Sequence, residues 1–257
     1  MRKAIYYTLL FLLVSMIGAL AAQTINSLTH ATAETSTMVT IGGVIVANVV
    51  VFIIFIWRKY CPVSRYYVRT KPWKVAVWCC IASLGTIIPS VWLEEHLSFL
   101  PDLSEGMEGM FGTPLGYIAI AICAPICEEV VFRGAVIRAL MDWRKNWKLA
   151  VVISALLFSI AHMNPAQMPH AFLLGLLLGW VFIRTNSVVP GIIIHGVNNL
   201  VVFIVASTIP SIEDMSLADL YGGSEMKAGF SVLFSLLILI PAIFQLHLNM
   251  KDKPEIS

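Results

Sequence analysis

The sequence predicts an all-α fold, a polytopic membrane helix bundle of about eight transmembrane helices with cytoplasmic N- and C-termini. Three observations support this prediction. Hydrophobic residues make up 58% of the 257 residues and charged residues 12%, against about 45–50% and about 25% in soluble domains, and the mean hydropathy is +0.84. Eight apolar stretches approach the roughly 17–25 residues that a helix needs to cross a bilayer. Basic residues gather in alternate connecting segments.

The apolar stretches predict helices over 4–22, 38–57, 73–93, 113–140, 149–163, 168–184, 187–208 and 228–248. The fourth is long and is expected to extend beyond the membrane on its basic side. The fifth and sixth are short and are joined by "MNPAQMPH". Gly175 and Gly179 form a small-xxx-small step on the sixth helix, which predicts close helix packing. We divide the chain into a three-helix scaffold (1–112), a core that carries the polar motifs (113–208), and an external loop, last helix and short tail (209–257).

The first stretch, "MRKAIYYTLLFLLVSMIGALAAQ", permits two interpretations. Its basic start and the small residues Ala19 and Ala21 are typical of a cleaved signal peptide. Its apolar run is longer than the usual roughly 7–15 residues of such a peptide. We therefore expect an uncleaved first helix, with cleavage of residues 1–22 as the alternative.

The placement of basic residues predicts the orientation in the membrane. If the N-terminus is cytoplasmic, every one of the 17 basic residues except Lys227 lies in an internal segment or at the internal end of a helix. The external loops 94–112 and 209–226 are acidic instead. A wrong helix count would reverse this bias partway along the chain, and no reversal occurs.

The stretch "APICEEVVFRGAV" places three ionisable side chains inside the fourth helix. Each would cost about 2.5–3.5 kcal/mol unpaired at the bilayer centre. Glu129 and Arg133 are spaced i, i+4 with the acid first, which predicts an ion pair on one helix face. Glu128 points about 100° away and stays available as a general base. Pro125, which lacks an N–H, predicts a local bend in this helix.

Two further helices carry polar motifs at i, i+4 spacing: Phe158 and His162 in "FSIAH", and His195 and Asn199, with Asn198 beside them, in "HGVNN". At about 1.5 Å per residue, Glu128 and His162 lie roughly 20 Å from the cytoplasmic ends of their helices, and His195 about 12 Å. These depths bring the three side chains within reach of one another, toward the cytoplasmic half of the membrane.

The remaining histidines and a second acidic pair have a simpler interpretation. His30, His96, His170 and His247 lie near segment ends and are expected to hydrogen-bond neighbouring backbone. Glu94, Glu95 and His96 form a second "EEH" where the third helix meets an acidic loop, and we expect no catalytic role for them.

The three motifs, in this order, resemble the CPBP family of type II CAAX prenyl endopeptidases and their bacterial relatives, including bacteriocin-immunity and lysostaphin-resistance-like proteins. "EEVVFR" fits E-E-x-x-x-R, "FSIAH" fits F-x-x-x-H and "HGVNN" fits H-x-x-x-N. The resemblance covers about residues 113–208. It implies an intramembrane protease core in this segment and a scaffold role for residues 1–112.

The resemblance also implies catalytic roles. Glu128 activates water with help from His162, and His195 and Asn199 stabilise the oxyanion. Glu129, Arg133, Phe158 and Asn198 are supporting residues, with Asn198 as an alternative third-motif amide. We prefer a mechanism that requires no cofactor. Glu128, His162 and His195 would also make a two-histidine, one-carboxylate zinc site with an open position, so Zn²⁺ stays open.

The expected activity is hydrolysis of peptide bonds in membrane-associated peptides or proteins, near the cytoplasmic membrane surface. The alternatives are a non-proteolytic scaffold or bacteriocin self-immunity protein of the same fold and, ranked lower, a proton-coupled transporter, since buried Glu and His also serve as proton relays. We expect a peptide or membrane-protein substrate, contact with the lipid bilayer and no nucleic-acid partner. The short loops favour a bacterial inner membrane. The motifs identify neither the substrate nor the oligomeric state.

Overall fold

The computed structural model describes residues 1–62, 73–103, 108–209, 211–212 and 215–250. The regular structure in these residues is helical throughout, which confirms the all-α prediction. Among the described residues, seven helices are long and apolar enough to cross a membrane, one fewer than predicted. The protein is therefore a multi-pass integral membrane protein. Five of the basic residues predicted to be internal lie outside the described residues: Arg65, Arg69, Lys71, Lys251 and Lys253.

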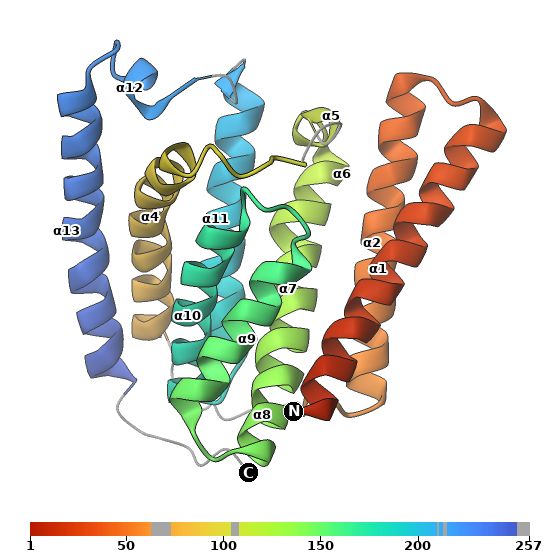
Figure 1. Ribbon diagram of the computed structural model, residues 1–257, viewed down its shortest axis with the longest axis horizontal. Coiled ribbons are helices and arrows are strands. Elements are labelled where there is room, and N and C mark those ends of the chain that lie inside the picture. Colours follow the sequence, from red (N-terminus) through yellow and green to blue (C-terminus); the bar gives the residue numbers. More distant parts are fainter. Residues whose placement is uncertain (63–72, 104–107, 210, 213–214, 251–257) are drawn as a thin grey trace.

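The first two helices form a hairpin at one side of the bundle (Figure 1). α1 (Arg2–Thr29) is longer than the predicted 4–22 and ends at His30, which adopts a left-handed conformation with φ 48°. α2 (Ala33–Trp57) begins after Thr32, whose hydroxyl accepts a hydrogen bond from the backbone N–H of Thr35. Toward the end opposite the N-terminus, α1 tilts away from the other helices (Figure 1).

One continuous 30-residue helical span, Pro114–Trp143, lies beside this hairpin. It consists of α6 (Pro114–Tyr117), the π-helix η1 (Ile118–Cys123), α7 (Ala124–Glu129), the π-helix η2 (Val130–Ile137) and α8 (Arg138–Trp143), and it follows the short α5 (Glu108–Phe111). All eight residues of η2 are buried. The largest hydrophobic cluster of the described residues gathers around this segment, so the charged motif belongs to the most buried part of the fold.

Three helices complete the motif-bearing core: α9 (Trp147–Ala161), α10 (Met168–Thr185) and α11 (Val189–Thr208). The predicted fifth helix exists as α9, but its 15 residues extend only about 22 Å, less than the roughly 30 Å hydrocarbon core. Asn164 precedes Pro165, and the proline ring disfavours a helical conformation of the residue before it. α9 therefore ends inside the bundle, which places His162 at its end.

Two long helices flank the core on the side away from the α1–α2 hairpin (Figure 1). α4 (Trp73–His96) packs against both α11 and α13 (Glu225–Asn249). The short α12 (Leu217–Leu220) precedes α13 and begins with a capping box at Ser216 and Asp219. A side chain at Gly85 would place its Cβ 2.9 Å from the backbone of Leu239, so this glycine permits the close approach of α4 and α13.

The start of α1 and the end of α13 lie at the same end of the bundle (Figure 1), which we call the terminal end; the opposite end is the distal end. This arrangement agrees with the predicted even number of passes. That the terminal end is cytoplasmic stays a prediction from the charge distribution.

Gly175 offers a test of the predicted close helix packing. A Cβ added there would lie 3.0 Å from Cα of Ala155, whereas one at Gly229 would meet nothing within 4 Å. We expect Gly175→Ala to lower the free energy of unfolding by about 1–3 kcal/mol through overpacking. Gly229→Ala should raise it by up to about 1 kcal/mol, because alanine is the better helix former. Thermal unfolding of the purified protein in detergent measures both, and equal midpoints would contradict the packing role.

Candidate active site

The predicted ion pair between Glu129 and Arg133 is present and buried. Arg133 Nη1 lies 2.8 Å from Glu129 Oε1, and both side chains are inaccessible to solvent. The contact is an ion pair rather than an aligned hydrogen bond. Arg133 Nη2 donates a hydrogen bond to the carbonyl of Gly175 at 3.4 Å, and its guanidinium carbon lies 4.3 Å from the centre of the Phe158 ring. A carbonyl and an aromatic face therefore complete the surroundings of the cation.

His195 lies between the two neighbouring glutamates. Its Nδ1 is 3.3 Å from Glu129 Oε1, and its Nε2 is 3.8 Å from Glu128 Oε2. An ionised Glu129, paired with Arg133, only accepts hydrogen bonds, so Nδ1 carries a proton. The carboxylate therefore fixes the orientation of the imidazole and directs Nε2 toward Glu128.

A glycine on α11 makes room for Glu129. An ideal Cβ built on Gly191 would lie 2.5 Å from Glu129 Oε2. That oxygen has no hydrogen-bond partner, so any side chain at this position would press directly on the buried carboxylate.

Glu128 is the more accessible of the two acids. Its side chain is 17% exposed, and its Oε2 has no hydrogen-bond partner. It lines a groove of about 460 Å³, which we call the Glu128 groove, between the core and the α1–α2 hairpin. The apolar wall comes from α1 and α2 and includes Phe11, Leu12, Met16 and Val44.

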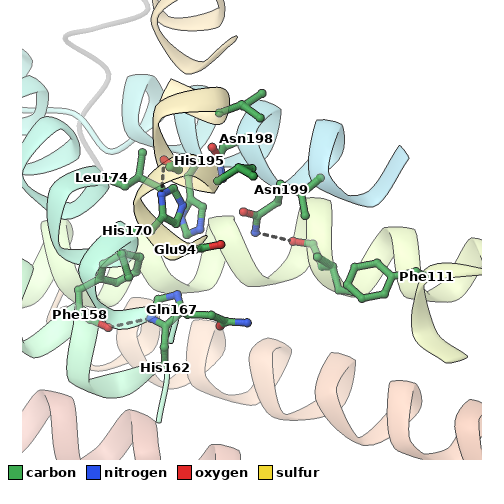
Figure 2. A pocket seen from close by; sticks show the side chains of 16 residues that line it. Glu94, Phe111, Phe158, His162, Gln167, His170, Leu174, His195, Asn198 and Asn199 are labelled. Carbon is green, nitrogen blue, oxygen red and sulfur yellow. Dashed lines mark hydrogen bonds between the residues drawn. The ribbon is translucent and has the colours of Figure 1, made fainter. Parts of the chain in front are cut away.

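A second cavity, of about 270 Å³, lies between α4, α10 and α11 (Figure 2). We call it the histidine cavity because His162, His170 and His195 line it, together with Asn198 and Asn199. The four predicted catalytic side chains therefore do not all face one cavity: Glu128 faces the groove, and His195 and Asn199 face the histidine cavity. Phe158, His162 and Gln167 line both, so His162 belongs to each compartment.

The histidine cavity lies toward the distal end, whereas the sequence placed the motifs toward the end that it predicts to be cytoplasmic. The residues of α4 and α10 that line the histidine cavity, from Ser90 to Glu94 and from His170 to Leu174, come from the distal halves of these helices (Figure 1). The short α9 explains the difference, because its early end places His162 and the following loop in the middle of the bundle. The cavity therefore runs from the bundle centre toward the distal end.

The π-helical geometry of η1 explains how Asn199 is held. In η1 the N–H of Ala124 bonds the carbonyl five residues earlier, that of Ala119. With the same five-residue spacing, the carbonyl of Ile120 would accept a hydrogen bond from the backbone N–H of residue 125. Residue 125 is a proline and has no N–H, so this bond cannot form. The Nδ2 of Asn199 donates to the Ile120 carbonyl instead, at 3.0 Å. The local bend predicted from Pro125 stays a prediction; the structure has a π-helical stretch before this proline, and the bond from Asn199 joins α11 to it.

The alternative amide, Asn198, is also buried at the histidine cavity. Its Oδ1 accepts a hydrogen bond from the hydroxyl of Thr86 on α4 at 3.5 Å. Asn199 keeps a second amide N–H beyond the bond to Ile120, so both amides remain compatible with the predicted role.

Two residues to which the sequence assigned no catalytic role also line the histidine cavity. His170 has its Nδ1 2.6 Å from the hydroxyl of Ser90, and Glu94 lies one helical turn beyond Ser90 on the same face of α4. The expectation that His170 hydrogen-bonds backbone was wrong. The spacing of Ser90 and Glu94 at i, i+4 was the one signal in the sequence that could have indicated this polar face.

The zinc alternative fits this geometry poorly. Among the described residues no three His, Cys, Asp or Glu side chains are grouped closely enough to hold a metal ion. The set Glu128, His162 and His195 is therefore not assembled as a ligand sphere, and we route no step through a metal.

Comparison with known proteins identifies the same segment as the motifs. Residues 111–201 match the family model described as type II CAAX prenyl endopeptidase Rce1-like. A curated relative described as UPF0177 protein in abiGi 5'region, from Lactococcus lactis subsp. cremoris, is 33% identical over 90 residues, which are 35% of this chain and 37% of the relative. No solved structure matches. The resemblance to this family is thereby confirmed over residues 111–201, within a multi-pass integral membrane protein.

Removal of one partner tests the buried ion pair. We expect Arg133→Leu to lower the free energy of unfolding by about 3–5 kcal/mol, because it leaves the Glu129 charge buried and unpaired. The double variant Glu129→Gln with Arg133→Leu should recover much of this loss, since it removes both charges. The unfolding midpoints of these variants in detergent are compared with that of the wild type, and Arg144→Leu, which removes an exposed arginine, is the control. A double variant no more stable than Arg133→Leu would refute the pairing.

Gly191 provides a geometric test of the site. We expect Gly191→Ala to displace the Glu129 carboxylate and with it His195, so that stability falls by about 1–3 kcal/mol through overpacking. Gly42→Ala, where an added Cβ meets nothing within 4 Å, is the matched control. If both variants unfold at the wild-type midpoint, the Glu129 carboxylate does not depend on the space that Gly191 leaves.

Proposed function

We propose that this protein is an intramembrane endopeptidase in which Glu128 activates water for attack on a peptide bond. The observation that carries the proposal is the unequal use of two adjacent carboxylates. Glu129 is buried between Arg133 and His195, whereas the Glu128 side chain is 17% exposed and lines a groove. The family match over residues 111–201 supports the reaction class.

The proposed first step takes place where the two compartments meet. A water in the Glu128 groove, between Glu128 and His162, gives its proton to the Glu128 carboxylate as its oxygen bonds to the scissile carbonyl carbon. The carbonyl π electrons move to the carbonyl oxygen. The second amide N–H of Asn199 is the donor for this oxyanion, and a preorganised donor of this kind lowers the barrier most where water is excluded.

The second step expels the amine. The oxyanion electrons re-form the carbonyl, the C–N bond breaks, and the proton held by Glu128 passes to the leaving nitrogen. His195 Nε2, 3.8 Å from Glu128 Oε2, is a second proton carrier beside the base. Glu129 orients this imidazole through Nδ1 and so acts as a positioning residue.

The substrate is proposed to be a membrane-associated peptide or protein, because Glu128 is reached through a groove with an apolar wall inside a membrane protein. The competing function is a non-proteolytic scaffold or self-immunity protein that keeps this fold without turnover. The transporter alternative has no specific support from the two compartments described.

Substitution of the base tests the proposal. Glu128→Gln keeps the size of the side chain but cannot accept a proton, and general-base catalysis typically contributes about 10²–10⁴-fold. We expect it to lower cleavage of a membrane-peptide library in liposomes at least about 100-fold, with an unchanged unfolding midpoint. Glu34→Gln, an exposed acid at the start of α2, should behave as wild type. If wild type and Glu128→Gln leave the library equally intact, the scaffold function is favoured.

A further inference from the structure

Glu94 is a carboxylate on the wall of the histidine cavity to which the proposed mechanism gives no task. It lies on the α4 side, and its side chain points into the space between His170 and His195 on one side and His162 and Gln167 on the other (Figure 2). It forms no hydrogen bond or ion pair within the part of the chain that the structure describes. Glu94 lies in the last turn of α4, at its distal end.

The neighbours of Glu94 in "EEH" have other partners. Glu95 accepts a hydrogen bond from the backbone N–H of Leu217 at the start of α12. His96 bonds the carbonyl of Trp92 through Nδ1 at 2.8 Å and stacks on the Trp92 ring. Of the two adjacent acids, one holds the distal loop in place and the other faces the cavity.

Among the described residues, the basic side chains that line this cavity beside the carboxylate are the three histidines. No lysine or arginine is among the residues described as lining it, and Arg133 is already paired with Glu129. The distal end is acidic in sequence as well, since segments 94–112 and 209–226 hold acidic residues and no lysine or arginine. A carboxylate with no lysine or arginine beside it favours a ligand of positive charge.

We propose that Glu94 determines substrate specificity by binding the side chain of a lysine or arginine near the scissile bond. This inference rests on the proposed function and deepens it, because it names the substrate class: a peptide that enters the histidine cavity with a cationic residue. Long, flexible cationic side chains suit this position, since their apolar stems can follow Val91, Phe111 and Leu174 along the cavity wall while the charge reaches Glu94.

The activity test uses one apolar host peptide with Lys, Gln or Glu placed in turn at each position. We expect the wild type to prefer Lys at one or two positions. Glu94→Gln should raise KM for those Lys peptides about 10–100-fold, the loss expected for a hydrogen bond to a charged group, with little change in kcat and in cleavage of the Gln peptides. Glu94→Lys should prefer the Glu peptides. Glu95→Gln, which keeps an oxygen to accept from Leu217, is the matched control.

A binding test separates this inference from the proposed function. The same fluorescent peptides are titrated against Glu128→Gln protein, which keeps the cavity intact, and against Glu128→Gln with Glu94→Gln. If Glu128→Gln binds the Lys peptides more tightly than the Gln and Glu peptides, and the double variant binds all three equally, the result supports the role of Glu94. This conclusion holds even if the wild type cleaves none of the peptides. Equal binding of Lys, Gln and Glu peptides overturns it, as does an equal loss of cleavage for all three in Glu94→Gln, which would indicate a structural role.

Discussion

The buried ion pair between Glu129 and Arg133 is the constraint on which the site depends. Neither charge reaches solvent, so each must be compensated inside the bundle. Glu129 Oε1 serves both Arg133 and His195 Nδ1, and Gly191 leaves room for the second oxygen. With Phe158 of α9 on the guanidinium and the Gly175 carbonyl of α10, five elements, α7, η2, α9, α10 and α11, meet at one carboxylate and one guanidinium.

This arrangement gives two neighbouring glutamates different environments. A turn of about 100° per residue sends Glu129 into the core and Glu128 toward the groove. His195 contacts both acids through its two ring nitrogens, so the structural acid also orients the imidazole beside the proposed base. The "EEH" of α4 repeats the division, with Glu95 bonded to the distal loop and Glu94 in the cavity.

The features that depend on local residue spacing could be predicted from the sequence. The Glu129–Arg133 pair follows from i, i+4 geometry. Apolar length was sufficient to place the helices, but it did not indicate that α9 is too short to cross the bilayer. The cavity wall at Glu94 and His170 could not be predicted, because it depends on how α4 packs against α10 and α11. The placement of Glu128 and Asn199 in two compartments was also missed, since it depends on the packing of Phe158 and His162, which line both. The hydrogen bond from Asn199 to Ile120 depends on a π-helical register that no spacing rule indicated.

The central claim, that Glu129 is structural and Glu128 is chemical, is tested most directly by the unfolding midpoints of Glu128→Gln and Glu129→Gln in the same detergent. The account predicts that Glu128→Gln unfolds at the wild-type midpoint. Glu129→Gln should unfold well below it, because Arg133 is then left buried without its counter-charge. Two equal midpoints, or a lower one for Glu128→Gln, would contradict the account.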